Sequence, residues 1–121
     1  MDMDKVNFIY TEVGTDIIVS LSIDEDTEFG IDGFTIIRTP KYEFILLPHE
    51  RGACLNWDEE TDTREIIKEI TCIGNEITFV SNIKSYQFDI SNLSKDELNE
   101  LRKTIDRMNF DKSIQISRKI K

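Results

Sequence analysis

The chain has 121 residues, of which 24 are Asp or Glu and 15 are Lys or Arg, so its formal net charge at pH 7 is −9. This length is sufficient for one domain with a substantial core, and apolar residues recur along the whole sequence, which excludes wholesale disorder. No apolar run approaches the roughly 18 residues that a membrane span needs. The acidic balance argues against nucleic acid as the main partner, because phosphate binding needs clustered Lys and Arg.

The negative charge lies in the first half of the sequence. Residues 1–60 hold 14 acidic and 4 basic residues, a net charge of −10, whereas residues 61–121 hold 10 acidic and 11 basic residues, a net charge of +1. No linker rich in Pro, Gly or Ser separates the halves. We therefore predict a single domain, 1–117, followed by a short basic tail, 118–121.

The N-terminus and the two cysteines bear on the cellular compartment. Residues 1–4 (MDMD) are acidic, whereas a secretory signal begins with basic residues and continues into an apolar stretch. We therefore expect a cytoplasmic protein in which Cys54 and Cys72 stay reduced and behave as small hydrophobic residues. A disulfide or a shared metal is the alternative, but their separation is not that of a zinc knuckle. We predict no metal and no cofactor.

Most of the chain has the pattern of β-strands. In the first strand Val6, Phe8 and Tyr10 share one parity and therefore one predicted face. Further apolar stretches follow at intervals of about 8–12 residues, which is typical of antiparallel sheets. The predicted strands after the first are 15–23, 33–38, 43–47, 52–57, 64–73, 76–81 and 85–90. A helix is an alternative for 64–73, but Gly74-Asn75 favours a strand that runs into a hairpin turn.

One helix is predicted over residues 94–109. Ser94 and Glu97 have capping-box spacing, in which each side chain accepts a hydrogen bond from the backbone N–H of the other residue. Apolar residues at steps of three and four then form one stripe, namely Leu98, Leu101, Ile105 and Met108. A last strand is predicted at 113–117. The pattern predicts an α+β fold, a mostly antiparallel twisted sheet with this C-terminal amphipathic helix packed on a face.

The turn His49-Glu50-Arg51 is the one candidate for chemistry. A His beside a carboxylate has the groups of a general base, and Arg51 has the charge to hold an anion. Adjacent residues in a turn rarely point at one reactant, and no Ser-His-Asp or Cys-His set can be assigned from spacing. We therefore favour a solvated turn and predict no catalytic residue. The alternative is a small-molecule-binding or enzymatic domain with a pocket near His49 and Arg51.

Two acidic runs contain the candidate partner-binding residues. These residues are Asp24, Glu25, Asp26, Glu28 and Asp32 in the first run, and Asp58, Glu59, Glu60 and Asp62 in the second, with Trp57 beside it. Neither run matches an EF-hand loop, because both lack the glycine at position 6. A merely solvated surface, with Trp57 in the core, is one interpretation. A docking surface for a basic partner is the other, since acidic rims steer basic partners and Trp is enriched among binding hot spots.

Three segments give the chain a resemblance to a known class of proteins. The chain opens with Asn7-Phe8-Ile9-Tyr10, an acidic loop precedes the strand 34–38, and residues 88–94 lead into the closing amphipathic helix. This layout resembles the small immunity proteins of bacterial polymorphic-toxin and contact-dependent-inhibition systems. The resemblance implies a cytoplasmic, non-enzymatic α+β domain that binds and neutralises a cognate toxin, often a nuclease with a basic surface. From the acidic balance and the lack of a long apolar run we expect neither a nucleic-acid nor a membrane partner.

Overall fold

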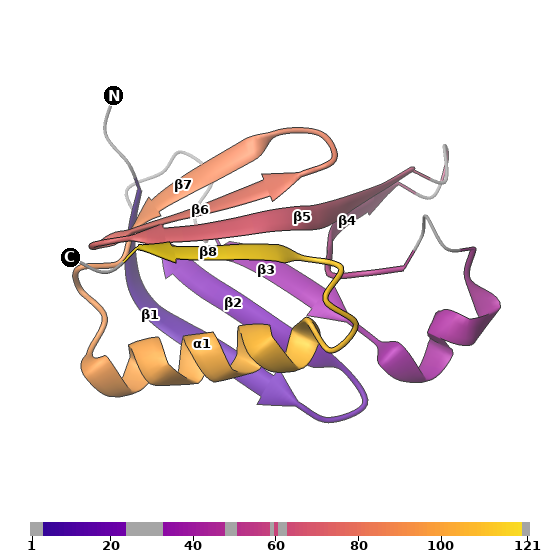
Figure 1. The fold of residues 1–121 in the computed structure, drawn as a ribbon, viewed down its shortest axis with the longest axis horizontal. Coiled ribbons are helices and arrows are strands. Elements are labelled where there is room, and N and C mark those ends of the chain that lie inside the picture. The colour runs from indigo at the N-terminus through magenta and orange to yellow at the C-terminus, as the bar shows by residue number, and fades with distance from the viewer. Residues whose placement is uncertain (1–3, 24–32, 48–50, 59, 61–62, 120–121) are drawn as a thin grey trace.

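The computed structural model describes residues 4–23, 33–47, 51–58, 60 and 63–119 (Figure 1). It has an α+β fold, as predicted, with a mixed sheet of eight strands and one C-terminal helix. The strands are β1 (Asp4–Val13), β2 (Ile17–Ile23), β3 (Gly33–Arg38), β4 (Cys54–Asp58), β5 (Thr63–Ile73), β6 (Glu76–Ser81), β7 (Ser85–Asp89) and β8 (Gln115–Lys119). The helices are α1 (Lys95–Met108) and the short 3₁₀ helix η1 (Pro40–Ile45).

The sheet curves until it closes on itself. Its strand order is β4-β3-β2-β1-β7-β6-β5-β8, and β4 also pairs with β5, which joins the two halves of the sheet. β5 is long enough to serve both halves, because its first residues pair with β4 and its later residues pair with β6 and β8. The apolar side chains on the concave side of this closed sheet form one core.

The sheet is not purely antiparallel, which corrects part of the prediction. β1 pairs in parallel with β7 near Asp4 and Phe88, and β5 pairs in parallel with β8 from Glu69 to Ile73. The β5–β8 pairing follows from the helix. α1 runs back across the sheet after β7, so that β8 starts at the same end as its partner, as a crossover connection requires.

Helix α1 begins where the sequence predicts and packs through the predicted stripe. The Ser94 Oγ accepts from the Glu97 N–H and the Glu97 carboxylate accepts from the Ser94 N–H, which completes the capping box. Leu101, Ile105 and Met108 are buried. The helix packs against β1 and β2 and faces β5 and β8 (Figure 1). It therefore covers apolar side chains on the inner side of the curved sheet.

Two changes in helix α1 test this packing. Ser94→Ala should lower the free energy of unfolding by roughly 0.5–2 kcal/mol, because one side-chain acceptor at the helix N-terminus is lost. Leu101→Ala should lower it more, by about 2–5 kcal/mol, because it leaves a cavity between helix and sheet. Urea unfolding followed by circular dichroism measures both values. Equal and negligible effects would mean that the stripe does not carry the packing.

Four aromatic rings form the centre of the core. The Phe34 ring of β3 lies 4.8 Å from that of Phe79, 5.1 Å from that of Tyr86 and 4.9 Å from that of Phe88, measured between ring centroids. These contacts bring β3 against β6 and β7, which lie across the core from it in the strand order. The rings therefore hold the two halves of the closed sheet together.

Strand β1 does not keep the predicted alternation. Val6 is fully buried, whereas Phe8 and Tyr10 are 59% and 55% exposed. The register against β2 shifts between Val6 and Phe8, which is the signature of a β-bulge. The extra residue turns the following side chains to the opposite face, so the shared face predicted for Val6, Phe8 and Tyr10 is wrong.

The segment predicted as a strand over 43–47 is largely the 3₁₀ helix η1. Pro40 occupies its first turn, where a fixed φ suits a helix and the missing N–H costs nothing. The Tyr42 N–H then donates to the Thr39 carbonyl and the Leu46 N–H donates to the Glu43 carbonyl.

At the other end of the chain β8 reaches Lys119, two residues into the segment predicted as a tail.

Candidate protein-interaction surface

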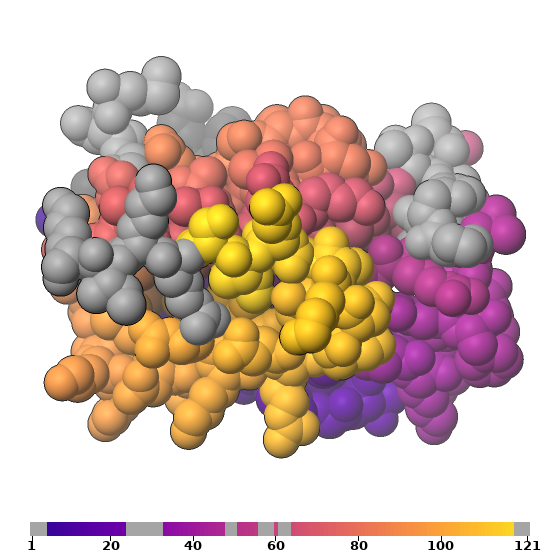
Figure 2. All heavy atoms as spheres, viewed as in Figure 1, coloured from indigo at the N-terminus to yellow at the C-terminus, as the bar shows by residue number. Residues whose placement is uncertain are grey.

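The short helix η1 presents apolar side chains to solvent. Phe44 and Ile45 are 77% and 68% exposed, the highest values among the large apolar side chains that the structure describes. Tyr42, Leu47 and the neighbouring Ile37 of β3 are exposed as well. Contiguous exposed apolar patches are uncommon on soluble domains and mark interaction sites. We call these five residues the η1 surface. Helix η1 forms one end of the molecule (Figure 2).

A groove of about 530 Å³ adjoins the η1 surface. Its walls come from η1, from the end of β3 and from the base of the β4–β5 hairpin, and among its residues are Ile37, Tyr42, Ile45, Cys54 and Leu55. Gly52 lies in this wall with a φ of +130°, and a Cβ there would approach the Ile66 side chain to 2.8 Å. Glycine is therefore required for the chain to pass so close to β5.

Arg38 fixes η1 to the rest of the fold. This residue ends β3 and is 1% exposed. Its Nε and Nη2 donate to the two carboxylate oxygens of Glu43, at 2.7 and 2.9 Å. Its Nη2 and Nη1 also donate to the two carboxylate oxygens of Asp111, at 2.8 and 2.9 Å, and Nη1 donates to the Met108 carbonyl at 2.8 Å. The Phe110 ring covers the guanidinium, with its centroid 4.1 Å from the Arg38 Cζ.

This cluster joins three parts of the chain that are distant in sequence. Glu43 belongs to η1, Asp111 follows the C-terminus of α1, and the Gly52 N–H also donates to Glu43 at 3.3 Å. All five N–H groups of the guanidinium have acceptors, which is what a buried Arg requires. η1 therefore presents its apolar side chains from a fixed position.

The charges of the cluster shift the pKa values of its members. Burial alone would lower the pKa of Arg38, but the hydrogen bonds and charges of Glu43 and Asp111 outweigh burial and raise it. The hydrogen bond from Arg38 holds the pKa of Asp111 below its ordinary value, although partial burial acts in the opposite direction. Both pKa shifts mean that the ion pair stabilises the charged forms of Arg38 and Asp111.

The low pKa of Asp111 predicts a loss of stability in acid. Because its pKa is lower in the folded than in the unfolded chain, its ion pair stabilises the fold above the ordinary carboxyl value of about 4. That stabilisation is lost as the pH falls through the folded pKa. Asp111→Asn should therefore lower stability at pH 7 and flatten the decline below pH 4, as measured by urea melts at pH 7, 4 and 2.5. Parallel pH profiles for the two proteins would contradict the assignment.

A second buried acidic side chain, that of Glu65, lies at the base of the β4–β5 hairpin and is hydrogen-bonded there. The Glu65 carboxylate of β5 is buried and accepts from the hydroxyls of Ser81 and Tyr86, each at 2.6 Å. Burial, together with the hydrogen bond and charge of Glu65, raises the pKa of Tyr86. Sequence patterns missed both Arg38 and Glu65 because an isolated charge in a strand gives no sign that it is buried.

The predicted partner-binding residues fall mostly outside the described part of the chain. Asp24, Glu25, Asp26, Glu28 and Asp32 lie outside it, as do Glu59 and Asp62. Trp57 and Asp58 are in β4, and Glu60 is exposed between β4 and β5. In the sequence the second acidic run extends from the last residue of β4 to the residue before β5, and the base of these two strands lines the groove beside η1. The first run connects β2 to β3 and attaches at the end of β3 opposite to η1.

The described residues give little support for the alternative site near His49 and Arg51. His49 lies outside the described residues. The Arg51 Nε donates to the Leu46 carbonyl at 3.1 Å, so this side chain caps the end of η1. Arg51 is also not one of the described residues that line the groove.

The two cysteines lie in separate places and neither is in a disulfide. Cys54 lines the groove beside η1, and burial raises the pKa of its thiol. Cys72 lies in β5 on the inner side of the sheet, and both residues are half-buried.

Among the described residues no three His, Cys, Asp or Glu side chains are grouped so as to hold a metal ion. None of the described helices is long and apolar enough to cross a membrane.

Comparison with known proteins gives no family. No protein-family model, no curated protein and no solved structure matches this chain.

Proposed function

We propose that this protein is a non-enzymatic inhibitor that binds a basic protein partner through the η1 surface and the adjacent β4–β5 hairpin. The observation that carries the proposal is the exposure of Phe44 and Ile45 on a helix that Arg38 holds in place. A cognate toxin with a basic surface, such as a nuclease, is the partner that the resemblance to immunity proteins implies. In this proposal the inhibitor acts by covering the active surface of the toxin.

The η1 surface has the composition of a binding-site core. Phe44, Ile45 and Tyr42 offer apolar and aromatic area that is exposed in the free protein. Burial of such area against a partner is favourable, by roughly 25 cal/mol for each Å². Because η1 is already held by the buried cluster, little ordering free energy is lost on binding.

The negative net charge of the chain favours a partner with a basic surface. The net charge is −9, and the β4–β5 connection carries Asp58, Glu59, Glu60 and Asp62. Acidic residues attract basic surfaces and raise the rate of association, so the sequence of this connection favours a basic partner. The alternative, a small-molecule or catalytic pocket near His49 and Arg51, has weaker support because the Arg51 guanidinium already caps η1.

Salt-dependent kinetics distinguish the roles of the two acidic runs. The first run precedes β3 in the sequence and η1 follows it, the six residues of β3 span about 20 Å, and charges are screened beyond about 8 Å at physiological salt, so we expect the second run to have the larger effect. Asp58→Asn with Glu60→Gln should therefore slow association and weaken its salt dependence more than Asp24→Asn with Asp26→Asn. Stability should change little in either variant. Equal effects, or a larger effect from the first run, would contradict placement of the binding site at η1.

A further inference from the structure

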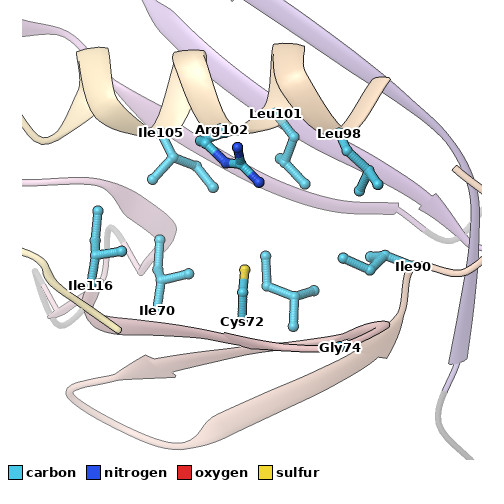
Figure 3. Close-up of a pocket in the computed structure, with 10 residues that line it drawn as sticks. Ile70, Cys72, Gly74, Ile90, Leu98, Leu101, Arg102, Ile105 and Ile116 are labelled. Carbon is cyan, nitrogen blue, oxygen red and sulfur yellow. The ribbon is translucent and has the colours of Figure 1, made fainter. Parts of the chain in front are cut away.

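A second cavity, of about 320 Å³, lies between α1 and the sheet, away from the η1 surface (Figure 3). Leu98, Leu101 and Ile105 project into it from the helix, and the opposite wall is formed by side chains of β5, β6 and β8 and by Ile90 after β7. The residues of that wall include Ile70, Cys72, Ile77 and Ile116. The inference drawn from this cavity is independent of the proposed partner binding.

Arg102 is the one charged side chain among the described residues that line the cavity. Arg102 is exposed, and its side chain extends from α1 at the edge of the cavity, between Leu101 and Ile105 in the view of Figure 3. None of the described carboxylates forms an ion pair with it. A guanidinium beside apolar walls is a strong donor for a planar carboxylate, because both oxygens can accept from it at once.

The volume of the cavity limits the size of a ligand, and its lining residues limit the chemistry of that ligand. An apolar cavity of about 150 Å³ holds one benzene molecule, which has six non-hydrogen atoms, so a cavity twice as large accepts about twelve. A wall of Ile and Leu side chains with one cation at its edge fits an alkyl chain that ends in an anion. We propose that this cavity binds a medium-chain fatty acid, with the alkyl chain between α1 and β5 and the carboxylate on Arg102.

Octanoate is a suitable probe because it has the required size and charge. It should bind the full chain about 5-fold more tightly than 1-octanol, which has the same chain but no charge. Arg102→Gln should remove this difference, whereas Lys103→Gln, a matched loss of charge one residue further along α1, should retain it. Equal binding of the acid and the alcohol to the unmodified protein, or equal losses in the two variants, would overturn the role of Arg102.

The two thiols locate the ligand within the protein. Cys72 points into the cavity and Cys54 lines the groove beside η1, so each reports on one site (Figure 3). Octanoate should slow alkylation of Cys72 and leave the rate at Cys54 unchanged. Cys72→Phe should fill the cavity and prevent binding, with urea melts as the check that it folds. No protection of Cys72 at millimolar octanoate, or equal protection of both thiols, would overturn the proposal even if Cys72→Phe does not fold.

Discussion

Arg38→Met is expected to lower the free energy of unfolding by about 3–5 kcal/mol, the largest effect of any single change outside the apolar core. The substitution keeps an unbranched side chain similar to the aliphatic part of Arg, but it removes the guanidinium and leaves the Glu43 carboxylate, whose side chain is 12% exposed, without its main donor. An unpaired charge in that position is more costly than the pair itself is stabilising. Urea unfolding at pH 7 measures the loss.

Two further variants separate this mechanism from a simple loss of packing. Arg38→Met with Glu43→Leu should regain part of the stability, because no carboxylate is left unpaired. Arg107→Met makes the same change at an exposed position in the last turn of α1 and should cost less than about 1 kcal/mol. If Arg38→Met is no more destabilising than Arg107→Met, the buried cluster does not hold η1 in place.

Phe44→Ala is expected to speed dissociation of the partner about 30-fold, with little change in association. This is the kinetic consequence of losing a packed aromatic anchor, which typically costs 2 kcal/mol or more at the centre of an interface. The free protein should keep its stability, because the Phe44 side chain is 77% exposed and contributes little to the core. Surface plasmon resonance with the isolated partner measures both rates.

The control for Phe44 is another exposed aromatic residue of the same fold. Phe8 lies on β1 and is 59% exposed, and Phe8→Ala should leave both rate constants unchanged. A slower association with unchanged dissociation in Phe44→Ala would mean that this ring does not contact the partner in the complex.

Local patterns were sufficient to predict most of the elements. Residues 33–38 and 76–81 coincide with β3 and β6, because apolar alternation and flanking turn residues are local properties. Helix α1 was equally readable, since Ser94 and Glu97 satisfy each other within one turn. Gly74, with a φ of +58°, ends β5 at the predicted hairpin.

Other features depend on contacts distant in sequence and were therefore not predicted. The bulge after Val6 is fixed by the pairing of β1 with β2, and the parallel pairing of β8 depends on where α1 returns the chain. The sequence predicts a strand where the 3₁₀ helix η1 lies, because the four residues 44–47 are all apolar. Pro40 and the lack of strict alternation after it were the available signals against a strand.

For a similar reason the sequence points to only part of the binding site that we propose. Charge runs are visible in a sequence, so the acidic residues of the β4–β5 connection were identified as candidates. The exposure of Phe44 and Ile45 was not, because apolar residues in a short run are expected to be buried. Their position on the surface follows from Arg38, Glu43 and Asp111, which come together only in the folded chain.

Binding of a protein partner to the η1 surface is open to a direct test. It is tested most directly by capture from the native host with three immobilised proteins: the unmodified chain, Phe44→Asp with Ile45→Asp, and Phe8→Asp with Tyr10→Asp. All three should show the same circular dichroism, because these side chains are exposed. The first and third proteins should retain the same basic protein, and the η1 variant should lose it. Retention by the η1 variant, or loss by the β1 variant alone, would contradict the account.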